Sequence, residues 1–389
     1  DGAKRKCVVE WCMKWVQRKF RDIYIKEAQS VYPLSMEAFD TRKDYFNCYN
    51  CTLDLATGEA HPHRAEDYIT KMSETVYDPS ASFPRWDRFI DEIMSGDREK
   101  ARFLQKTRGY ALSANRPFEC AFFDYGETSR NGKGTLAESI LRVMGDYGAS
   151  VRPETLAQKN HVNSHAPTED LARLKGIRYA VVPEPKKGMV LDAGLFKSMS
   201  GNDTLNVRFL NENSFEFRPE YALYVNMNHL PVINDMTVFE SGRVVIIPFN
   251  RHFREEEQDR NLKSDFARPE VQSAILNWLL EGYRMLREEG LGKPQSVKDA
   301  VEAYYYDSNK IARFVEDRLT KDFEGEERTS EVYEAYRDWC CENGCHVENC
   351  RNFLPEIRRT CEIVRRRPRG GGDKTTLLVG YRLDRSVFQ

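Results

Sequence analysis

The stretch Tyr125-Gly126-Glu127-Thr128-Ser129-Arg130-Asn131-Gly132-Lys133-Gly134-Thr135 decides the fold of this 389-residue chain. It follows a short apolar run and precedes a segment, 136–144, whose apolar residues recur at helical spacing. A tight loop between a strand and a helix points backbone N–H groups at an anion, and the helix dipole adds to the attraction. We therefore predict a phosphate-binding loop in which Lys133 neutralises the β- and γ-phosphates of a nucleotide.

The loop departs from the usual pattern at two positions. Glu127 stands where the first glycine is expected, with Gly126 one step earlier, and Gly134 replaces the Ser or Thr that ordinarily contacts Mg²⁺. Thr135 then supplies the nearby hydroxyl, for Mg²⁺ or the α-phosphate. We assign nucleotide contacts to Ser129, Arg130, Asn131, Gly132, Lys133, Gly134 and Thr135.

Short apolar runs alternate with helical segments around this loop. The runs lie at 120–123, 177–182, 222–225 and 244–247. Strands that are buried on both faces of a parallel sheet have this continuous apolar character, so we predict an α/β core at about 119–250.

Polar residues stand at the ends of three of these runs. Glu184 follows the second run and has the chemistry to orient Mg²⁺ and activate an attacking water. Asn228 follows the third run and has an amide that can hold the water or the γ-phosphate. Arg243 precedes the fourth run, where its guanidinium could reach the γ-phosphate of a neighbouring subunit. The structural alternative for each is an ordinary surface residue at a strand end.

The order of these features resembles the superfamily 3 helicases, specifically the phage and plasmid primase-helicase family related to the poxvirus primase-helicase. Between the strands with Glu184 and Asn228 stand a short hairpin and the stretch Leu195-Phe196-Lys197-Ser198-Met199-Ser200-Gly201-Asn202-Asp203. The resemblance extends outside the core to Asn50-Cys51-Thr52-Leu53-Asp54-Leu55, Gly109-Tyr110-Ala111-Leu112, Asn277-Trp278-Leu279-Leu280-Glu281-Gly282-Tyr283 and Tyr336-Arg337-Asp338-Trp339. It therefore covers nearly the whole chain.

The resemblance implies an ATPase of the AAA+ type that forms a ring, usually a hexamer, and translocates 3′→5′ on single-stranded DNA. ATP and Mg²⁺ are the implied cofactors. The matching positions are Lys133 and Thr135 (Walker A), Glu184 (Walker B), Asn228 (sensor 1), Arg243 (an arginine finger acting in trans) and Lys197 with Asp203 (a motif peculiar to this superfamily). Pro183 leaves Glu184 as the single acid, so Mg²⁺ would be held by Thr135, Glu184, phosphates and water.

On this basis we expect four parts within an α/β fold. They are a mainly helical, collar-like domain at 1–105, a P-loop AAA+ motor at 106–250, a helical segment packed on the motor at 251–307 and a winged-helix-like domain at 308–389. The first residue is Asp1, so we expect a piece of a longer chain, with a primase or polymerase domain as one candidate for the part upstream. The expected setting is the replication fork of a phage, plasmid or related element in the cytoplasm of a bacterial host cell.

Lys197 and two segments are candidates for contact with DNA. Positions 204–217 alternate like a hairpin, in which Arg208 could neutralise a phosphate and Phe209 could pack against a sugar or base. The alternative is a plain hairpin with Phe209 in the core. At the other candidate, positions 351–374 hold eight Lys or Arg and three acids. A helix over 349–360 and a basic strand resemble the recognition helix and wing of a winged-helix domain, and the wing arginines are Arg365, Arg366, Arg367 and Arg369.

Composition sets further limits. There are 59 basic and 61 acidic residues, so the net charge of −2 excludes a uniformly basic nucleic-acid binder. No apolar run approaches the roughly 18 residues of a membrane-spanning helix, so we expect no membrane partner. Ten cysteines in such a chain favour a reducing compartment. Zinc at Cys48 and Cys51, or at the group of Cys340, Cys341, Cys345, Cys350 and His346, is less expected than ordinary buried thiols.

Two other functions are open at this stage. Gly-Lys-Gly-Thr also occurs in small-molecule nucleotide kinases, although positions 135–153 offer no lid of arginines. A DNA-binding replication initiator that uses ATP mainly as an assembly switch is the stronger alternative, since the residues for Mg²⁺ are few.

Overall fold

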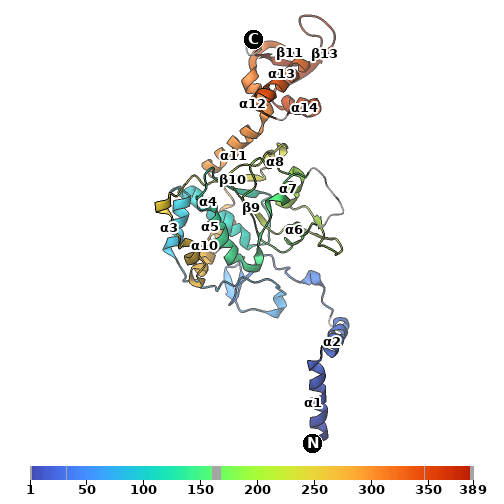
Figure 1. Cartoon of the computed structure of the whole chain (residues 1–389), viewed down its shortest axis with the longest axis vertical. Coiled ribbons are helices and arrows are strands. Elements are labelled where there is room, and N and C mark those ends of the chain that lie inside the picture. Colours follow the sequence, from blue (N-terminus) through green and yellow to red (C-terminus); the bar gives the residue numbers. More distant parts are fainter. Residues whose placement is uncertain (1, 32, 160–167, 346, 386–389) are drawn as a thin grey trace.

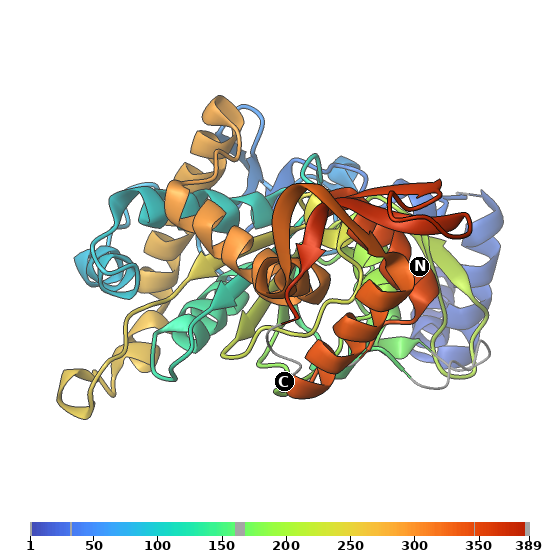
Figure 2. The same ribbon diagram turned by 90° about the horizontal axis from the view of Figure 1, so that it is seen from above.

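The structure is a computed structural model that describes residues 2–31, 33–159, 168–345 and 347–385. The molecule is elongated (Figure 1). Helices α1 (Gly2–Val16) and α2 (Arg18–Val31) lie at one end of the long axis. A small C-terminal domain lies at the other end, and the main body stands between them. Figure 2 looks along this axis from the C-terminal end.

A parallel five-stranded sheet forms the centre of the main body. Its strands are β4 (Ala121–Tyr125), β5 (Gly148–Ser150), β6 (Tyr179–Val182), β9 (Ala222–Met227) and β10 (Val244–Pro248), in the order β10-β4-β9-β6-β5. Every neighbouring pair is parallel. All four predicted apolar strands are confirmed. The fifth, β5, has the sequence Gly-Ala-Ser and therefore no apolar run that would predict it.

Helices cover both faces of this sheet. Successive side chains of a strand point to opposite faces, so Phe122 joins a core with α4 (Arg98–Gly109), α5 (Lys133–Met144) and α10 (Pro269–Glu289). Phe123 joins a second core with α7 (Ala193–Ser200) and α11 (Gln295–Ser308). The predicted domain boundaries after residues 105 and 250 do not divide this first core, because the core also contains Phe46 and Leu279.

The N-terminal part is less helical than expected. Strands β1 (Tyr45–Asn47), β2 (Thr52–Asp54) and β3 (Glu59–His61) form an antiparallel sheet ahead of α3 (Pro84–Ile93). The apolar residues of segment 4–26 recur at helical spacing and predict one helix, but the structure breaks it at Gln17 into α1 and α2, so the prediction of one continuous helix is wrong. The break brings Trp15 onto Tyr24 with ring centroids 4.5 Å apart, whereas nine residues of unbroken helix would separate them by about 13 Å.

Two glycines let α4 and α10 cross closely. A Cβ on Gly109 would lie 2.2 Å from the backbone N of Tyr283, and a Cβ on Gly282 would lie 2.2 Å from the carbonyl O of Gln105. Any larger residue would force the helices apart, so this crossing fixes α10 against the end of α4, which leads into β4.

The C-terminal domain has its own core. Its elements are α12 (Lys310–Arg318), β11 (Leu319–Arg328), α13 (Thr329–Glu342), α14 (Cys350–Thr360), β12 (Glu362–Arg366) and β13 (Thr375–Leu383), with an antiparallel sheet of order β11-β13-β12. Phe314, Tyr336, Trp339 and Phe353 pack at its centre. The predicted helix over 349–360 and the predicted basic strand after it are confirmed as α14 and β12. In the described ranges, no helix has the length and apolar character to cross a membrane.

Candidate nucleotide-binding site

The predicted phosphate loop joins β4 to α5, which begins at Lys133. Gly132 adopts a φ of 86°, and a Cβ there would lie 2.3 Å from Cγ2 of Ile93, so both the backbone and the space require glycine. Gly126 is similarly constrained, because its Cβ would lie 2.5 Å from the carbonyl O of Phe249. The amide of Asn131 donates to the carbonyl O of Thr128 at 2.6 Å and closes the loop on itself.

Three of the predicted catalytic residues form one hydrogen-bonded chain. Lys133 Nζ donates to Asn228 Oδ1 at 2.7 Å, and Asn228 Nδ2 donates to Glu184 Oε1 at 2.6 Å. They meet because β9 lies between β4 and β6, and the carboxyl ends of these parallel strands share one edge. A cation, an amide and a carboxylate thus stand side by side at the helix N-terminus, where a triphosphate would bind.

Burial sets the electrostatics of Lys133. Loss of hydration lowers the pKa of its ammonium group to about 8, while the charges of Asp124 and Glu184 act in the opposite direction. Its Nζ also donates to the carbonyl O of Gly126 at 3.3 Å. An unhydrated cation of this kind gains most when an anion arrives, because little water must be removed.

The residues fit an Mg²⁺ ion that is held mostly by phosphates and water. Thr135 lies in the first turn of α5 and is partly exposed, and Glu184 is exposed at the end of the hydrogen-bonded chain from Lys133. No cluster of three or more His, Cys, Asp or Glu occurs within the described ranges. Octahedral Mg²⁺ tolerates such a site because it keeps several waters and binds substrate phosphates.

A buried ion pair beneath the loop was not predicted. Arg108, at the end of α4, donates from Nη2 to both oxygens of Asp124 at 2.5 Å, and both side chains are almost fully buried. Its guanidinium also lies 4.4 Å from the ring centroid of Tyr224. The pair fixes β4 just before the loop. Sequence reasoning had no signal for it beyond a charged residue inside an apolar run.

Arg243 lies away from this group. Val244 pairs with Ala121 and Pro248 pairs with Tyr125, so Arg243 stands at the amino end of the sheet. A five-residue strand spans about 17 Å, which separates the guanidinium from the loop of its own chain. It donates to Glu119 Oε2 at 2.8 Å and to the carbonyl O of Lys197 at 3.0 Å.

The residues predicted for the DNA hairpin are partly engaged within the fold. Lys197, in α7 ahead of the hairpin, donates from Nζ to Asp235 Oδ2 at 2.6 Å. The hairpin of β7 (Leu205–Val207) and β8 (Phe215–Phe217) is present, as predicted. Phe209 stacks on Phe215 with centroids 5.7 Å apart and packs against the core, whereas the backbone of Arg208 bonds to Thr168. This geometry favours the structural role for Phe209.

The four wing arginines divide into two pairs. Arg366 and Arg369 form ion pairs with Glu326 on β11, at 2.6 and 3.3 Å. Arg365 and Arg367 are exposed, and neither side chain has a partner in the part of the chain that the structure describes. On α14, Arg359 forms an ion pair with Glu240 of the main body at 2.6 Å.

The cysteines behave as thiols. Burial raises the pKa of Cys48 far above its usual range, and the neighbouring Cys51 is also buried. All ten are free, and His346 of the second cysteine group lies outside the described residues.

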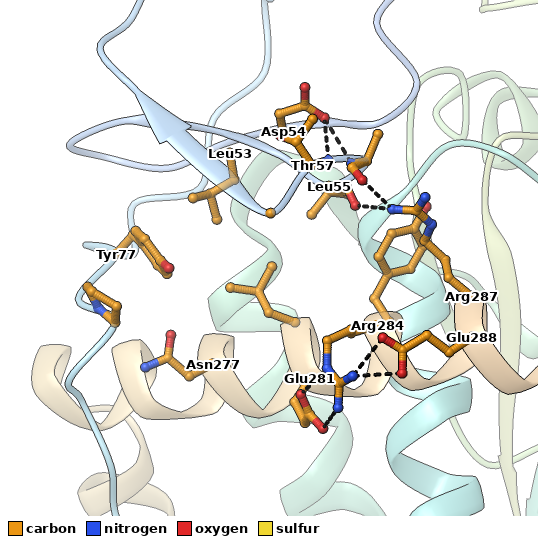
Figure 3. A pocket seen from close by; sticks show the side chains of 15 residues that line it. Leu53, Asp54, Leu55, Thr57, Tyr77, Asn277, Glu281, Arg284, Arg287 and Glu288 are labelled. Carbon is orange, nitrogen blue, oxygen red and sulfur yellow. Dashed lines mark hydrogen bonds and ion pairs between the residues drawn. The ribbon is translucent and has the colours of Figure 1, made fainter.

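A cavity of about 630 Å³ lies apart from the loop, between the β2–β3 turn and α10 (Figure 3). Its charged side chains are already engaged. Arg284 pairs with Glu281 and Glu288, and Arg287 donates to the carbonyls of Leu55 and Ala56. We therefore place the chemistry at the phosphate loop and not at this cavity.

The fold and the loop define a mixed α/β protein whose parallel sheet is compatible with a P-loop nucleoside triphosphatase core. Residues 1–95 match the family model described as D5 N terminal like. The chain is 27% identical over 266 residues to "Putative helicase 022R" of Frog virus 3, a match covering 64% of this chain and 27% of that protein. It is 23% identical over 343 residues to "Putative helicase L207/L206" of Acanthamoeba polyphaga mimivirus, covering 82% and 35%.

Further matches agree with these. "Putative primase C962R" of African swine fever virus is 24% identical over 273 residues, covering 65% of this chain and 28% of that protein. The apo C-terminal region of NrS-1 shares the fold, with a TM-score of 0.50, 12% identity and coverage of 79% and 77% of the two chains. The chain thus spans about a third or less of its viral relatives.

The chain is similar to viral proteins named as helicases and primases, which confirms the resemblance to primase-helicases that the motif order indicates. These relatives come from viruses of eukaryotes, so the expected phage source and bacterial host cell gain no support from them.

Proposed function

We propose that this chain is the ATP-driven motor part of a viral DNA primase-helicase. The contact chain from Lys133 through Asn228 to Glu184 carries the proposal, because it joins a phosphate-binding cation to a carboxylate that can activate water. The relatives named as helicases and primases support a role in DNA replication.

A triphosphate entering the loop would take Lys133 Nζ from Asn228 Oδ1, since a phosphate oxygen is the more strongly charged acceptor. The amide of Asn228 then becomes free to orient a water beside the γ-phosphate. The oxygen of that water attacks the γ-phosphorus while Glu184 accepts a proton from the water. The bond between the γ-phosphorus and the leaving nucleoside diphosphate breaks in the same step. Bound Mg²⁺ would neutralise the β- and γ-phosphate oxygens, with Thr135 and Glu184 as the nearby protein oxygens.

The first test measures ATP hydrolysis by the Lys133→Ala variant. Turnover should fall at least about 100-fold, because the variant loses the cation that neutralises the phosphates. Lys187→Ala is the matched control, since this exposed lysine follows the Glu184 strand without entering the contact chain. Equal turnover by Lys133→Ala and the parent protein would remove the loop from the mechanism.

We also propose that the motor works as a hexameric ring that moves 3′→5′ on single-stranded DNA, and that Arg243 acts on the nucleotide of a neighbouring subunit. Support comes from its place at the opposite end of the sheet from its own loop, where it cannot reach its own nucleotide. The Glu119 ion pair would have to open for this contact.

Mixing two inactive variants tests the shared site. The Arg243→Ala variant keeps an intact phosphate loop, and the Lys133→Ala variant keeps Arg243. Some interfaces in a mixed ring therefore combine an intact loop from one subunit with Arg243 from its neighbour. Mixed rings should hydrolyse ATP faster than the sum of the separate variants, measured at increasing mixing ratios. A mixture that stays at the level of the separate variants would leave Arg243 a structural residue.

An assembly switch is the second candidate function. Its support is the hydrogen bond from Asn228 to Glu184, which occupies the carboxylate that would activate water. Light scattering measures oligomer formation with ATP, and a parallel assay measures ATP hydrolysis. Oligomers that form with ATP but do not hydrolyse it would favour the switch.

A further inference from the structure

A second cavity opens directly beside the phosphate loop. Its volume is about 300 Å³, at the lower end of the range for small-molecule sites. Arg130, Gly132 and Thr135 line one side, and Phe89 of α3 and the segment 253–263 line the others. An adjoining cavity lined by Arg88, Arg251 and Phe253 extends it toward the surface.

The segment 253–263 is attached to the loop itself. The backbone N–H of Phe253 donates to the carbonyl O of Arg130 at 2.9 Å, and a ring nitrogen of His252 lies 2.8 Å from the carbonyl O of Ser129. The cavity and the loop therefore form one continuous site, and a molecule with phosphates in the loop would extend into the cavity past Thr135.

The cavity suits an uncharged, flat group. Phe89, Phe253 and Leu262 give it apolar walls. Most of its charges are paired, because Arg85 contacts Glu92 and Asp259, Glu257 contacts Arg251, and Lys263 contacts Glu138. Arg130, next to the loop, is the lining cation whose side chain has no partner within the described ranges, so an anion is favoured at the loop end of the cavity. The Arg251 guanidinium lies 5.0 Å from the Phe253 ring centroid, and an aromatic ring could stack on the other face of Phe253.

We propose that this cavity is the nucleobase pocket of the nucleotide whose phosphates occupy the loop, with Phe253 as the stacking residue. The inference rests on the proposed function, since it assumes a nucleotide in the loop. It adds that the segment following β10 binds the base and is coupled to the phosphates through Arg130 and Ser129.

Calorimetric titration of the full chain with ATP and with inorganic tripolyphosphate, both with Mg²⁺, tests the pocket. The parent protein should bind ATP more tightly than tripolyphosphate. Phe253→Leu should weaken ATP binding about 10- to 100-fold, the range expected for one stacked base, and leave tripolyphosphate binding within about twofold. Phe253→Tyr, which keeps the ring, should retain ATP affinity.

Glu256→Ala is the matched control, because Glu256 is exposed in the same segment and does not line the cavity. Equal affinity of the parent protein for ATP and tripolyphosphate would overturn the pocket and leave the proposed function standing. Equal weakening of both ligands by Phe253→Leu would also overturn it, since Phe253 would then only support the loop. Failure of both ligands to bind the parent protein would overturn the proposed function, and the pocket with it.

Discussion

At the scale of one residue, the buried ammonium group of Lys133 destabilises the ligand-free protein. Its ammonium group is buried before any phosphate arrives, and an amide oxygen is a weaker partner than a phosphate. Sites built for charged ligands commonly hold such unfavourable charges, because the ligand later compensates them. The empty protein should therefore be less stable than one with a neutral side chain at this position.

Lys133→Met should raise the free energy of unfolding of the ligand-free protein by about 1–3 kcal/mol at pH 7. The native state lowers the pKa of Lys133 from 10.5 to about 8. Between these values the unfolded chain binds the extra proton, so parent stability rises with pH. The advantage of Lys133→Met should be full below about pH 8 and lost near pH 10.5, as urea titrations at several pH values would measure. Equal stability of the two proteins at pH 7 would contradict this.

Residue patterns predicted the contact chain but not its support. Lys133, Glu184 and Asn228 each follow a recognisable strand, and parallel strands place their carboxyl ends together. Arg108 and Asp124 gave no such signal, because their contact joins a helix end to a strand interior and depends on the crossing of α4. For Arg243 the pattern offered only an arginine before a strand, and the resemblance supplied the role of an arginine finger.

At the scale of elements, the sequence predicted the buried apolar strands, the hairpin over 204–217 and the helix over 349–360, and it missed several short or charged strands. Strand β11 carries the charged sequence Leu-Thr-Lys-Asp-Phe-Glu-Gly-Glu-Glu-Arg, and it forms because β13 supplies its hydrogen bonds. Strands β1 to β3 have three residues each, too few for a period-two pattern to emerge. Such elements depend on tertiary partners more than on their own residues.

The crossing of α4 and α10 gives a prediction at this scale. Gly109→Ala should destabilise the protein by at least about 2 kcal/mol, because its Cβ would meet backbone atoms that cannot move alone. Gly194→Ala in α7 is the matched control, since its Cβ has ordinary contact distances. Thermal unfolding of the two variants measures the difference, and equal melting temperatures would contradict the close crossing.

At the scale of the whole molecule, the sequence did not predict how the C-terminal domain meets the main body. Arg351 and Arg359 of α14 line a cavity of about 340 Å³ opposite Asp235 and Thr237. This face of α14 was predicted to meet DNA. Arg359 instead pairs with Glu240 at the end of α8 (Thr237–Glu240), so duplex or single-stranded DNA could occupy the face only after the domain moves.

Reversing one charge of this contact should undock the domain. Glu240 and Arg359 are each about half exposed, so their attraction contributes only about 0–1 kcal/mol, but Glu240→Arg replaces it with repulsion. Small-angle scattering should then give a larger radius of gyration, and an oligonucleotide should bind about two- to fivefold more tightly as Arg359 becomes available.

The double variant Glu240→Arg/Arg359→Glu restores attraction and the parent charge, so its radius of gyration should return to the parent value. Glu356→Arg removes the partner of Arg359 within α14 and should leave the radius unchanged. An unchanged radius in Glu240→Arg would mean that α11 and the body hold the domain without this pair.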